Sequence, residues 1–214
     1  MRHLTLLPLA AACFALAGCN FTAQAPTTTA TDADTSTQAD APAPAPAKPA
    51  MTEAASPSTS LTAGAPAPDF SAQAWLAGNE FNYALADARA KGPVVLYFFP
   101  AAYTPGCNVE AHQFSKAIDK FAAAGASVIG VTAGNADQLA KFSADNESCA
   151  GKFPVAADPG AKIAAQYGVV LEQKPEWSNR TSFVIDREGR IAAVHSDLSP
   201  DGHVDAMLAG LKAP

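Results

Sequence analysis

The sequence predicts an α/β fold, a mixed central sheet flanked by helices, and three features of the chain support this class. Residues 94–99 are an apolar, β-branched and aromatic run of strand length, closed by a proline. A long segment with apolar residues at helical spacing follows it, and shorter strand and helix patterns alternate after that. The last patterns along the chain are a hairpin and a helix. Strands and helices that alternate and finish in this way describe a sheet with both parallel and antiparallel neighbours.

The first 18 residues have the pattern of a targeting segment rather than of a folded element. They have a basic start and an apolar middle over residues 4–16. This run is too short for a membrane span and is typical of a secretory signal. Residues 16–19 match a bacterial lipobox, which predicts cleavage before Cys19 and lipid attachment to it. An ordinary signal peptide with an incidental cysteine is the alternative.

Residues 19–63 are predicted to be a tether that carries the lipid on Cys19 and does not fold. Alanine, proline and threonine dominate this segment, and it has no periodic apolar pattern with which to bury surface. As a flexible coil it would span roughly 35–40 Å root-mean-square. The folded domain is therefore expected at residues 64–214, a length that suits one hydrophobic core.

The composition disfavours nucleic acid as a partner. The chain of 214 residues has a formal net charge of −6 at pH 7, without a basic patch, an aromatic–arginine array or a phosphate-type glycine loop. His195 and His203 have no recognisable ligand-like partners in the sequence. No metal or other cofactor is expected.

Within the domain, turn and capping residues separate the predicted elements. A glycine–asparagine pair at 78–79 marks a turn between two short strands, and Asn135 or Asp137 is placed to cap a helix. Ser199 is expected to cap the last helix. The other predicted elements are a strand at 94–99, a helix at 105–124, a strand at 127–132, a helix ending near 146, a strand at 153–156, a helix at 162–167, a hairpin of 181–186 with 191–195, and a helix reaching 212.

The turn between the 94–99 strand and the following helix carries the most informative residues of the chain. Thr104 is predicted as the helix N-cap and Pro105 as the first helical residue, where its missing N–H costs nothing. Cys107 then occupies the third helical position. Unpaired backbone N–H groups and the positive end of the helix dipole favour an anion there, so the sequence predicts that Cys107 reacts as a thiolate.

The spacing of Pro100, Thr104 and Cys107 resembles the signature of the peroxiredoxins, within the AhpC/TSA family. Glu110 makes the segment most similar to the bacterioferritin comigratory, or Q-type, branch. Three further segments resemble the family in its order along the chain: residues 67–70, 158–168 and 180–186. The resemblance implies a thioredoxin-like fold. It also implies a thiol-dependent peroxidase that reduces hydrogen peroxide and organic hydroperoxides.

The resemblance also implies roles for the residues around Cys107. Thr104 would give its hydroxyl to the thiolate or the peroxide, and Arg180 would pair with both. Glu110 lies three residues beyond Cys107, near the same helix face, and would hold Arg180 by a bidentate pair. Pro100 would shield the thiolate pocket. The alternatives are a surface arginine, an exposed helix glutamate and a proline that only ends a strand.

Cys149 is the expected resolving cysteine. Many Q-type members carry a second cysteine five residues after the first, where this chain has His112. Cys149 is then the only other thiol of the mature domain, which predicts an intramolecular disulfide with Cys107 after oxidation. A permanent structural disulfide and an idle buried thiol are the alternatives.

A non-catalytic thioredoxin-like lipoprotein, binding a metal or a protein through Cys107 and His112, is the rival interpretation. A general thiol–disulfide oxidoreductase is disfavoured because the chain has no Cys-x-x-Cys pair. The favoured enzyme would be anchored through Cys19 on the periplasmic face of a bacterial membrane, and Asn20 favours the outer membrane. Its expected partners are a peroxide and a thioredoxin-like or small-thiol reductant, and its expected assembly is a monomer or weak dimer.

Overall fold

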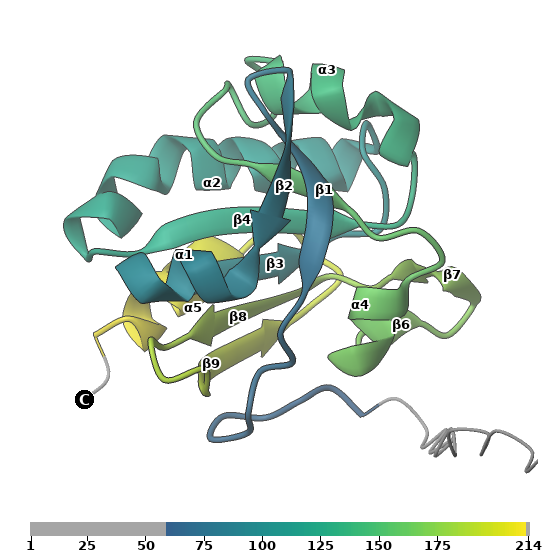
Figure 1. Ribbon diagram of the computed structural model, residues 1–214. Coiled ribbons are helices and arrows are strands. Elements are labelled where there is room, and N and C mark those ends of the chain that lie inside the picture. Colours follow the sequence, from purple (N-terminus) through teal and green to yellow (C-terminus); the bar gives the residue numbers. More distant parts are fainter. Residues whose placement is uncertain (1–58, 213–214) are drawn as a thin grey trace, which may run out of the picture. The chain divides into compact units, whose positions relative to one another are not determined.

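The computed structural model describes residues 59–212 (Figure 1). The signal segment, Cys19 and most of the tether lie outside the described residues, so the expectations for them stay predictions. Leu61 already contacts the domain, because its N–H donates to the carbonyl oxygen of Tyr167 at 3.1 Å. Within residues 59–212, no helix is both long enough and apolar enough to cross a membrane.

The elements follow the predicted alternation of strands and helices. The strands are β1 (Ser71–Leu76), β2 (Asn79–Ala84), β3 (Val94–Phe98), β4 (Ser127–Thr132), β5 (Val155–Ala157), β6 (Val170–Leu171), β7 (Lys174–Ser178), β8 (Thr181–Ile185) and β9 (Ile191–Ser196). The helices are α1 (Leu85–Lys91), α2 (Pro105–Ala123), α3 (Leu139–Ala144), α4 (Lys162–Gln166) and α5 (His203–Gly210), with a 3₁₀ turn at Ala136–Gln138.

Among the described residues, seven strands form one sheet in the order β2-β1-β5-β4-β3-β8-β9. β3 pairs in parallel with β4, and β4 pairs in parallel with β5. β8 pairs with β3 in the antiparallel sense, and antiparallel pairs add β1, β2 and β9 towards the two edges. The predicted mixed α/β class is therefore confirmed.

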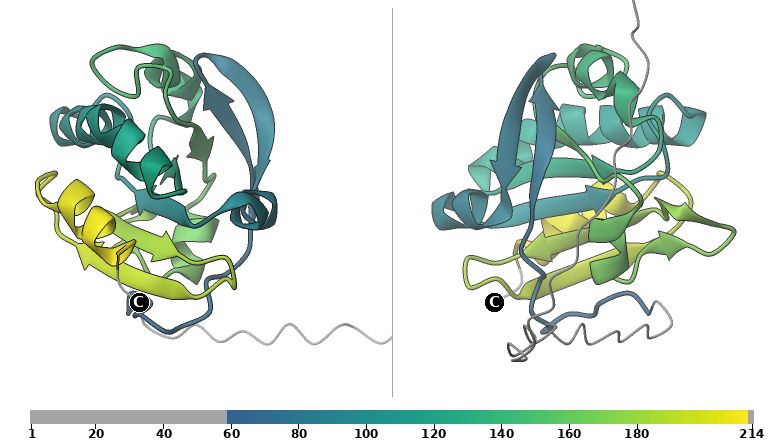
Figure 2. Two further views of the ribbon diagram at one scale, coloured as in Figure 1. Left: turned by 90° about the vertical axis from the view of Figure 1, so that its left-hand side faces the viewer. Right: turned by 45° about the vertical axis from the view of Figure 1, so that its right-hand side comes forward.

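β3 is buried along its whole length and separates two halves of the core. Tyr97 and Phe99 pack in the half that contains residues of α2, α3 and α5, whereas Leu96 and Phe98 pack in the half that contains residues of α1 and α4. Neighbouring side chains along a strand point to opposite faces, so a strand covered on both faces reads as a continuous apolar run. Figure 2 shows α2 and α5 beside each other on one side of the sheet.

The last helix begins later than predicted. Gly202, not Ser199, is the N-cap of α5, and it adopts the left-handed conformation with φ of 91°. The hydroxyl of Ser199 instead accepts the N–H of Asp201 at 3.2 Å. A run of proline, aspartate and glycine favours a turn, and this turn takes the residues that a serine-capped helix would have used.

The sequence patterns did not predict α1, β6 or β7. α1 buries only Leu85, so no apolar period of 3.6 residues marks it. β6 and β7 form a two-stranded sheet of their own, in a segment where no element was predicted. Within it, the Nζ atom of Lys174 lies 3.1 Å from the centroid of the Trp177 ring. Mostly polar strands outside the main sheet carry no alternating apolar pattern.

α2 keeps its predicted bounds closely, and its apolar residue Val109 is 45% exposed. Its buried side chains are Cys107, Glu110, Ala111, Phe114, Ser115, Ala117 and Phe121. These positions follow the three- and four-residue spacing of one helix face. The helix therefore presents Cys107 and Glu110 to the interior, where they meet residues from β8 and α5.

Candidate active site

α2 begins as predicted, with Thr104 as N-cap and Pro105 as first residue. The carbonyl oxygen of Thr104 accepts the N–H of Asn108 at 3.0 Å, the first hydrogen bond of the helix. The hydroxyl of Thr104, however, donates to the carbonyl oxygen of Ala101 at 3.1 Å and caps no helical N–H. The expected hydrogen bond from Thr104 to the sulfur is therefore not formed, because the preceding turn offers the hydroxyl a nearer acceptor. A role of Thr104 towards peroxide stays a prediction.

The end of β4 and the residues just after it hold the turn before α2 in place, a role that the sequence analysis did not predict for them. Thr132 is fully buried, and its hydroxyl donates to the carbonyl oxygen of Pro100 at 3.0 Å. The side chain of Asn135 donates to the carbonyl oxygen of Ala102 at 2.8 Å. Gly134 approaches so closely that a Cβ there would lie 2.4 Å from the oxygen of Pro100. These contacts fix the direction in which α2 starts.

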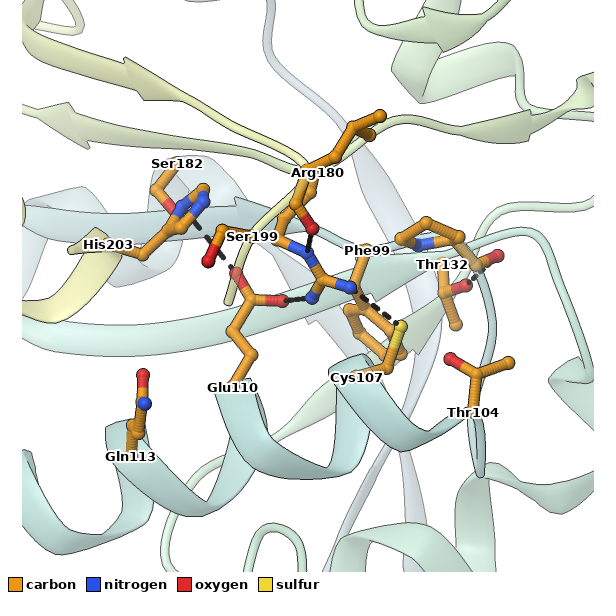
Figure 3. A network of polar contacts seen from close by, with 12 residues as sticks. Phe99, Thr104, Cys107, Glu110, Gln113, Thr132, Arg180, Ser182, Ser199 and His203 are labelled. Carbon is orange, nitrogen blue, oxygen red and sulfur yellow. Dashed lines mark hydrogen bonds and ion pairs between the residues drawn. The ribbon is translucent and has the colours of Figure 1, made fainter. Parts of the chain in front are cut away.

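Cys107 lies in the first turn of α2 and is 1% exposed. Arg180, the residue before β8, reaches it from across the core, and one terminal guanidinium nitrogen donates to its sulfur at 3.5 Å (Figure 3). The Nε atom of Arg180 donates to the carbonyl oxygen of Leu198 at 3.0 Å, which orients the guanidinium. A buried guanidinium beside a thiol supplies the positive charge that a thiolate needs.

Gly106 makes the contact between Arg180 and Cys107 sterically possible. A Cβ at position 106 would lie 3.0 Å from the guanidinium nitrogen that faces the sulfur. A larger residue would have to push Arg180 away, so glycine serves here for close approach. This role of Gly106 is not visible in the sequence, because Arg180 lies far along the chain.

Glu110 is fully buried and forms an ion pair with Arg180 through one oxygen, Oε2. The expected bidentate pair is not formed, because the second terminal nitrogen of Arg180 faces Cys107 instead. The other oxygen, Oε1, has no hydrogen-bond partner and lies 3.6 Å from Nδ1 of His203. Burial raises the pKa of Glu110 to about 8, although the Arg180 guanidinium acts in the opposite direction.

With this geometry established, comparisons with known proteins are informative. The profile of the AhpC/TSA family matches residues 63–194, which include Cys107 and Arg180. A Mycobacterium tuberculosis protein named as a peroxiredoxin is 39% identical over 125 residues, which cover 57% of this chain and 79% of that protein. The chloroplastic peroxiredoxin Q of Suaeda salsa is 32% identical over 133 residues, which cover 62% of this chain and 60% of that protein. The crystal structure of peroxidoxin BcpB from Mycobacterium tuberculosis has a TM-score of 0.63 at 34% identity, covering 71% of this chain and 97% of that one.

The chain belongs to the AhpC/TSA family. The family match and the structural similarity confirm the predicted thioredoxin-like fold. Together with the relatives named as peroxiredoxins, they confirm that the chain is a thiol-dependent peroxidase. The lipid anchor and the roles of individual residues stay proposals.

Cys149, the second thiol of this peroxiredoxin domain, has different surroundings. It is fully buried and belongs to the same apolar cluster as Cys107, together with Phe142 and Phe153. Burial, and to a smaller extent the charge of Asp145, raises its pKa. Both thiols are free, so a permanent disulfide between them is not formed.

Pro100 and His112 lie outside the polar network around Cys107. Pro100 is half-buried, and its carbonyl oxygen binds Thr132. His112 lies further along α2, half-buried, and its Nδ1 atom has no hydrogen-bond partner. In the part of the chain that the structure describes, no group of three or more histidine, cysteine, aspartate and glutamate side chains is arranged to hold a metal ion. The rival metal-binding interpretation therefore gains no support from the geometry.

Proposed function

We propose that this thiol-dependent peroxidase reduces hydrogen peroxide and organic hydroperoxides with Cys107 as the attacking thiol. The observation that carries the proposal is the 3.5 Å contact between a terminal nitrogen of Arg180 and the sulfur of Cys107 in a buried site. This guanidinium can compensate the charge of the thiolate before the reaction. It can also compensate the charge that develops on the peroxide oxygens in the transition state.

The reaction step needs only the thiolate, the peroxide and a proton. The sulfur of Cys107 attacks one peroxide oxygen, so that an S–O bond forms while the O–O bond breaks. The departing oxygen takes up a proton and leaves as water or as an alcohol. Cys107 is thereby oxidised by two electrons to a sulfenic acid. The N–H groups in the first turn of α2 have no intrahelical acceptor and are available as further donors.

We infer that Cys149 resolves the sulfenic acid by forming a disulfide with Cys107. Cys107 and Cys149 are the only cysteines of the chain after Cys19, and both belong to one apolar cluster. Turns hold Cys149 in place, since the N–H of Lys152 donates to its carbonyl oxygen at 3.0 Å. Disulfide geometry requires the two Cα atoms to come within about 7 Å, which local opening of these turns would allow. A thioredoxin-like or small-thiol reductant would then restore both thiols.

Intact mass after one equivalent of hydrogen peroxide tests this thiol chemistry. The wild-type protein should become about 2 Da lighter than its reduced form and yield a peptide that joins Cys107 to Cys149. Cys149→Ser should instead become about 16 Da heavier, as the sulfenic acid. Wild-type protein that gains oxygen without a linked peptide would contradict the role of Cys149. A Cys107 that does not react at all would contradict the proposed attacking thiol.

We also propose that lipid on Cys19 anchors the enzyme to the periplasmic face of a bacterial membrane, with the outer membrane favoured by Asn20. Residues 16–19 support this through their match to a lipobox. The mature protein should partition into the detergent phase, and Cys19→Ala should move it to the aqueous phase. A wild-type mature protein that is unlipidated and stays aqueous would contradict the anchor.

A further inference from the structure

Three fully buried polar residues lie behind Arg180, on the side away from Cys107: Glu110, Ser182 and His203. They come from three separate elements, α2, β8 and α5. Figure 3 shows their order in space: Arg180 lies between Cys107 and Glu110, and His203 and Ser182 lie beyond Glu110. Buried polar groups of this kind are costly unless they satisfy one another, so the arrangement of their hydrogens carries information.

The hydrogen on the His203 ring can be assigned from its partners. Its Nε2 atom lies 3.0 Å from the carbonyl oxygen of Asp197, which can only accept, so Nε2 carries a hydrogen. Burial lowers the pKa of His203 to about 4, which keeps the ring neutral at pH 7. The neutral ring then has a lone pair on Nδ1, which lies 2.8 Å from the hydroxyl oxygen of Ser182.

The free oxygen of Glu110 faces this lone pair. Oε1 lies 3.6 Å from Nδ1 of His203 and has no hydrogen-bond partner among residues 59–212. If the carboxyl group is ionised, two acceptors face each other in a buried site, and Oε1 stays unsatisfied. If the carboxyl group carries a proton on Oε1, it can donate to Nδ1 after a small closing of the gap, in place of the hydroxyl hydrogen of Ser182, which rotates away from this lone pair. One proton thus satisfies the orphaned oxygen.

The charges around Arg180 favour the same state. Its guanidinium contacts two groups that can each be an anion, the thiolate of Cys107 and the carboxylate of Glu110. One buried cation balances one buried anion, and two anions beside it disfavour each other. We propose that Glu110, Ser182 and His203 share one proton behind Arg180, and that this proton neutralises Glu110 and leaves the guanidinium to the thiolate of Cys107. His203 is then a positioning residue for the proposed peroxidase site, on which this inference rests.

Three other titratable groups face the cluster: His195, Asp197 and Tyr97. His195 packs edge-on against His203, with ring centroids 4.6 Å apart, and it lowers the pKa of His203 further. Asp197, in the loop before α5, acts in the opposite direction. Tyr97 of β3 lies near Glu110 and Cys107, and burial raises its pKa, so that it stays neutral. Arg180 is the cation that contacts both Cys107 and Glu110.

The pH dependence of Cys107 alkylation, measured on the full chain without peroxide, tests the proposal. His203→Phe removes the acceptor for the carboxyl proton, so Glu110 ionises more readily and competes for Arg180. We expect the pH midpoint of Cys107 alkylation to rise by about one pH unit. One additional negative charge near a thiol in a protein interior has an effect of about this size. Glu110→Gln keeps an N–H donor and carries no charge, so its midpoint should equal that of wild type or lie below it.

The double variant separates this coupling from a merely structural effect. Glu110→Gln combined with His203→Phe has no carboxylate left to ionise, so its midpoint should return to that of Glu110→Gln alone. His112→Phe, the same exchange at a histidine outside the cluster, should leave the midpoint unchanged. A wild-type midpoint in His203→Phe, or a double variant that keeps the raised midpoint, would overturn the proposal.

Infrared spectroscopy keeps the proposal testable if His203→Phe does not fold. The difference spectrum of wild type minus Glu110→Gln at pH 7 should contain the C=O band of a protonated carboxylic acid. A difference spectrum with carboxylate bands alone would overturn the proposal. Neither measurement depends on peroxide turnover, so a failure of the peroxidase role of Cys107 would appear separately, as turnover that persists in Cys107→Ser.

Discussion

The two cysteines of the domain are equally buried, at 1% and 0% exposure, yet their surroundings differ in almost every other respect. Cys107 stands in the first turn of a helix and accepts a hydrogen bond from a guanidinium. Cys149 stands in a turn after α3, among aromatic side chains, and Asp145 is the charged group that acts on it. Burial therefore does not decide whether a thiol is reactive. The sign of the neighbouring charge and the helix terminus decide it.

The hydrogen bonds that hold the two turns differ as well. The turn before α2 is fixed by Thr132 and Asn135, which bind its carbonyl oxygens. The turn that carries Cys149 is held mostly by hydrogen bonds between residues close to one another in the sequence. In one of them the N–H of Ala150 donates to the carbonyl oxygen of Asp145 at 2.9 Å. Local bonds can open without disturbing the sheet. We therefore expect Cys149 to move towards Cys107.

Serine replacement should give the largest contrast between the two cysteines. Cys107→Ser should reduce peroxide turnover to the uncatalysed background, because a neutral hydroxyl does not replace a thiolate as nucleophile. Cys149→Ser should keep the first oxidation at its wild-type rate but lose most turnover with a thioredoxin-like reductant. Stopped-flow oxidation and steady-state turnover measure the two effects. Normal turnover by Cys149→Ser with its physiological reductant would make Cys149 a bystander.

The alkylation rates of the two thiols at neutral pH should also differ by a large factor, although by less than the effects of serine replacement. Burial raises the pKa of Cys149 in the folded protein, so its thiol stays protonated at pH 7 and becomes a thiolate only at higher pH. The raised pKa makes its thiolate scarcer at pH 7 than that of an exposed cysteine. Mass-resolved iodoacetamide labelling should therefore modify Cys107 first. In unfolded protein the two rates should converge, and equal rates in the folded protein would remove the contrast.

Arg180→Ala tests which neighbour makes Cys107 different. Loss of a charge-assisted hydrogen bond of about 1.5–3 kcal/mol should slow the first oxidation roughly 10- to 150-fold. Arg187→Ala is a matched control, since Arg187 is exposed and its side chain donates to the carbonyl oxygen of Lys91, far from Cys107 in the chain. A wild-type oxidation rate in Arg180→Ala would show that the helix terminus alone suffices.

Tyr103→Phe probes the connection between the two regions and should have the smallest effect. The hydroxyl of Tyr103, next to the Cys107 turn, donates to Oδ2 of Asp145 in the Cys149 turn at 3.1 Å. Losing this bond, worth about 0.5–1.5 kcal/mol, should make opening easier and speed disulfide formation about 2- to 12-fold. Tyr83→Phe, whose buried hydroxyl has no partner, is the control. Unchanged disulfide kinetics would mean that the Cys149 turn opens without breaking this bond.

The success of the sequence prediction varied with the range of the interactions concerned. β3, α2 and the β8–β9 hairpin were predictable because their apolar patterns match the period of each element. The resemblance predicts that the hydroxyl of Thr104 binds the thiolate or the peroxide, whereas in the structure it binds the carbonyl oxygen of Ala101, which depends on the exact course of the turn. Ser199 was assigned as a cap but lies before a turn that ends at Gly202. The residues of β6 and β7 have no alternating apolar pattern that would predict a strand, because these strands lie outside the main sheet.

The sequence by itself determined the helix start that carries Cys107. Thr104 and Pro105 act on neighbouring backbone groups, and such local preferences do not require the rest of the fold. Only the tertiary structure decided that one terminal nitrogen of Arg180 binds Cys107 and the other binds Glu110. It also decided that His203 faces the other oxygen of the Glu110 carboxyl group. These residues lie far apart in the chain and meet only because the pairing of β3 with β8 and the packing of α5 bring them together. Burial then removes water from the cluster, so that charge and proton must be shared among the residues themselves.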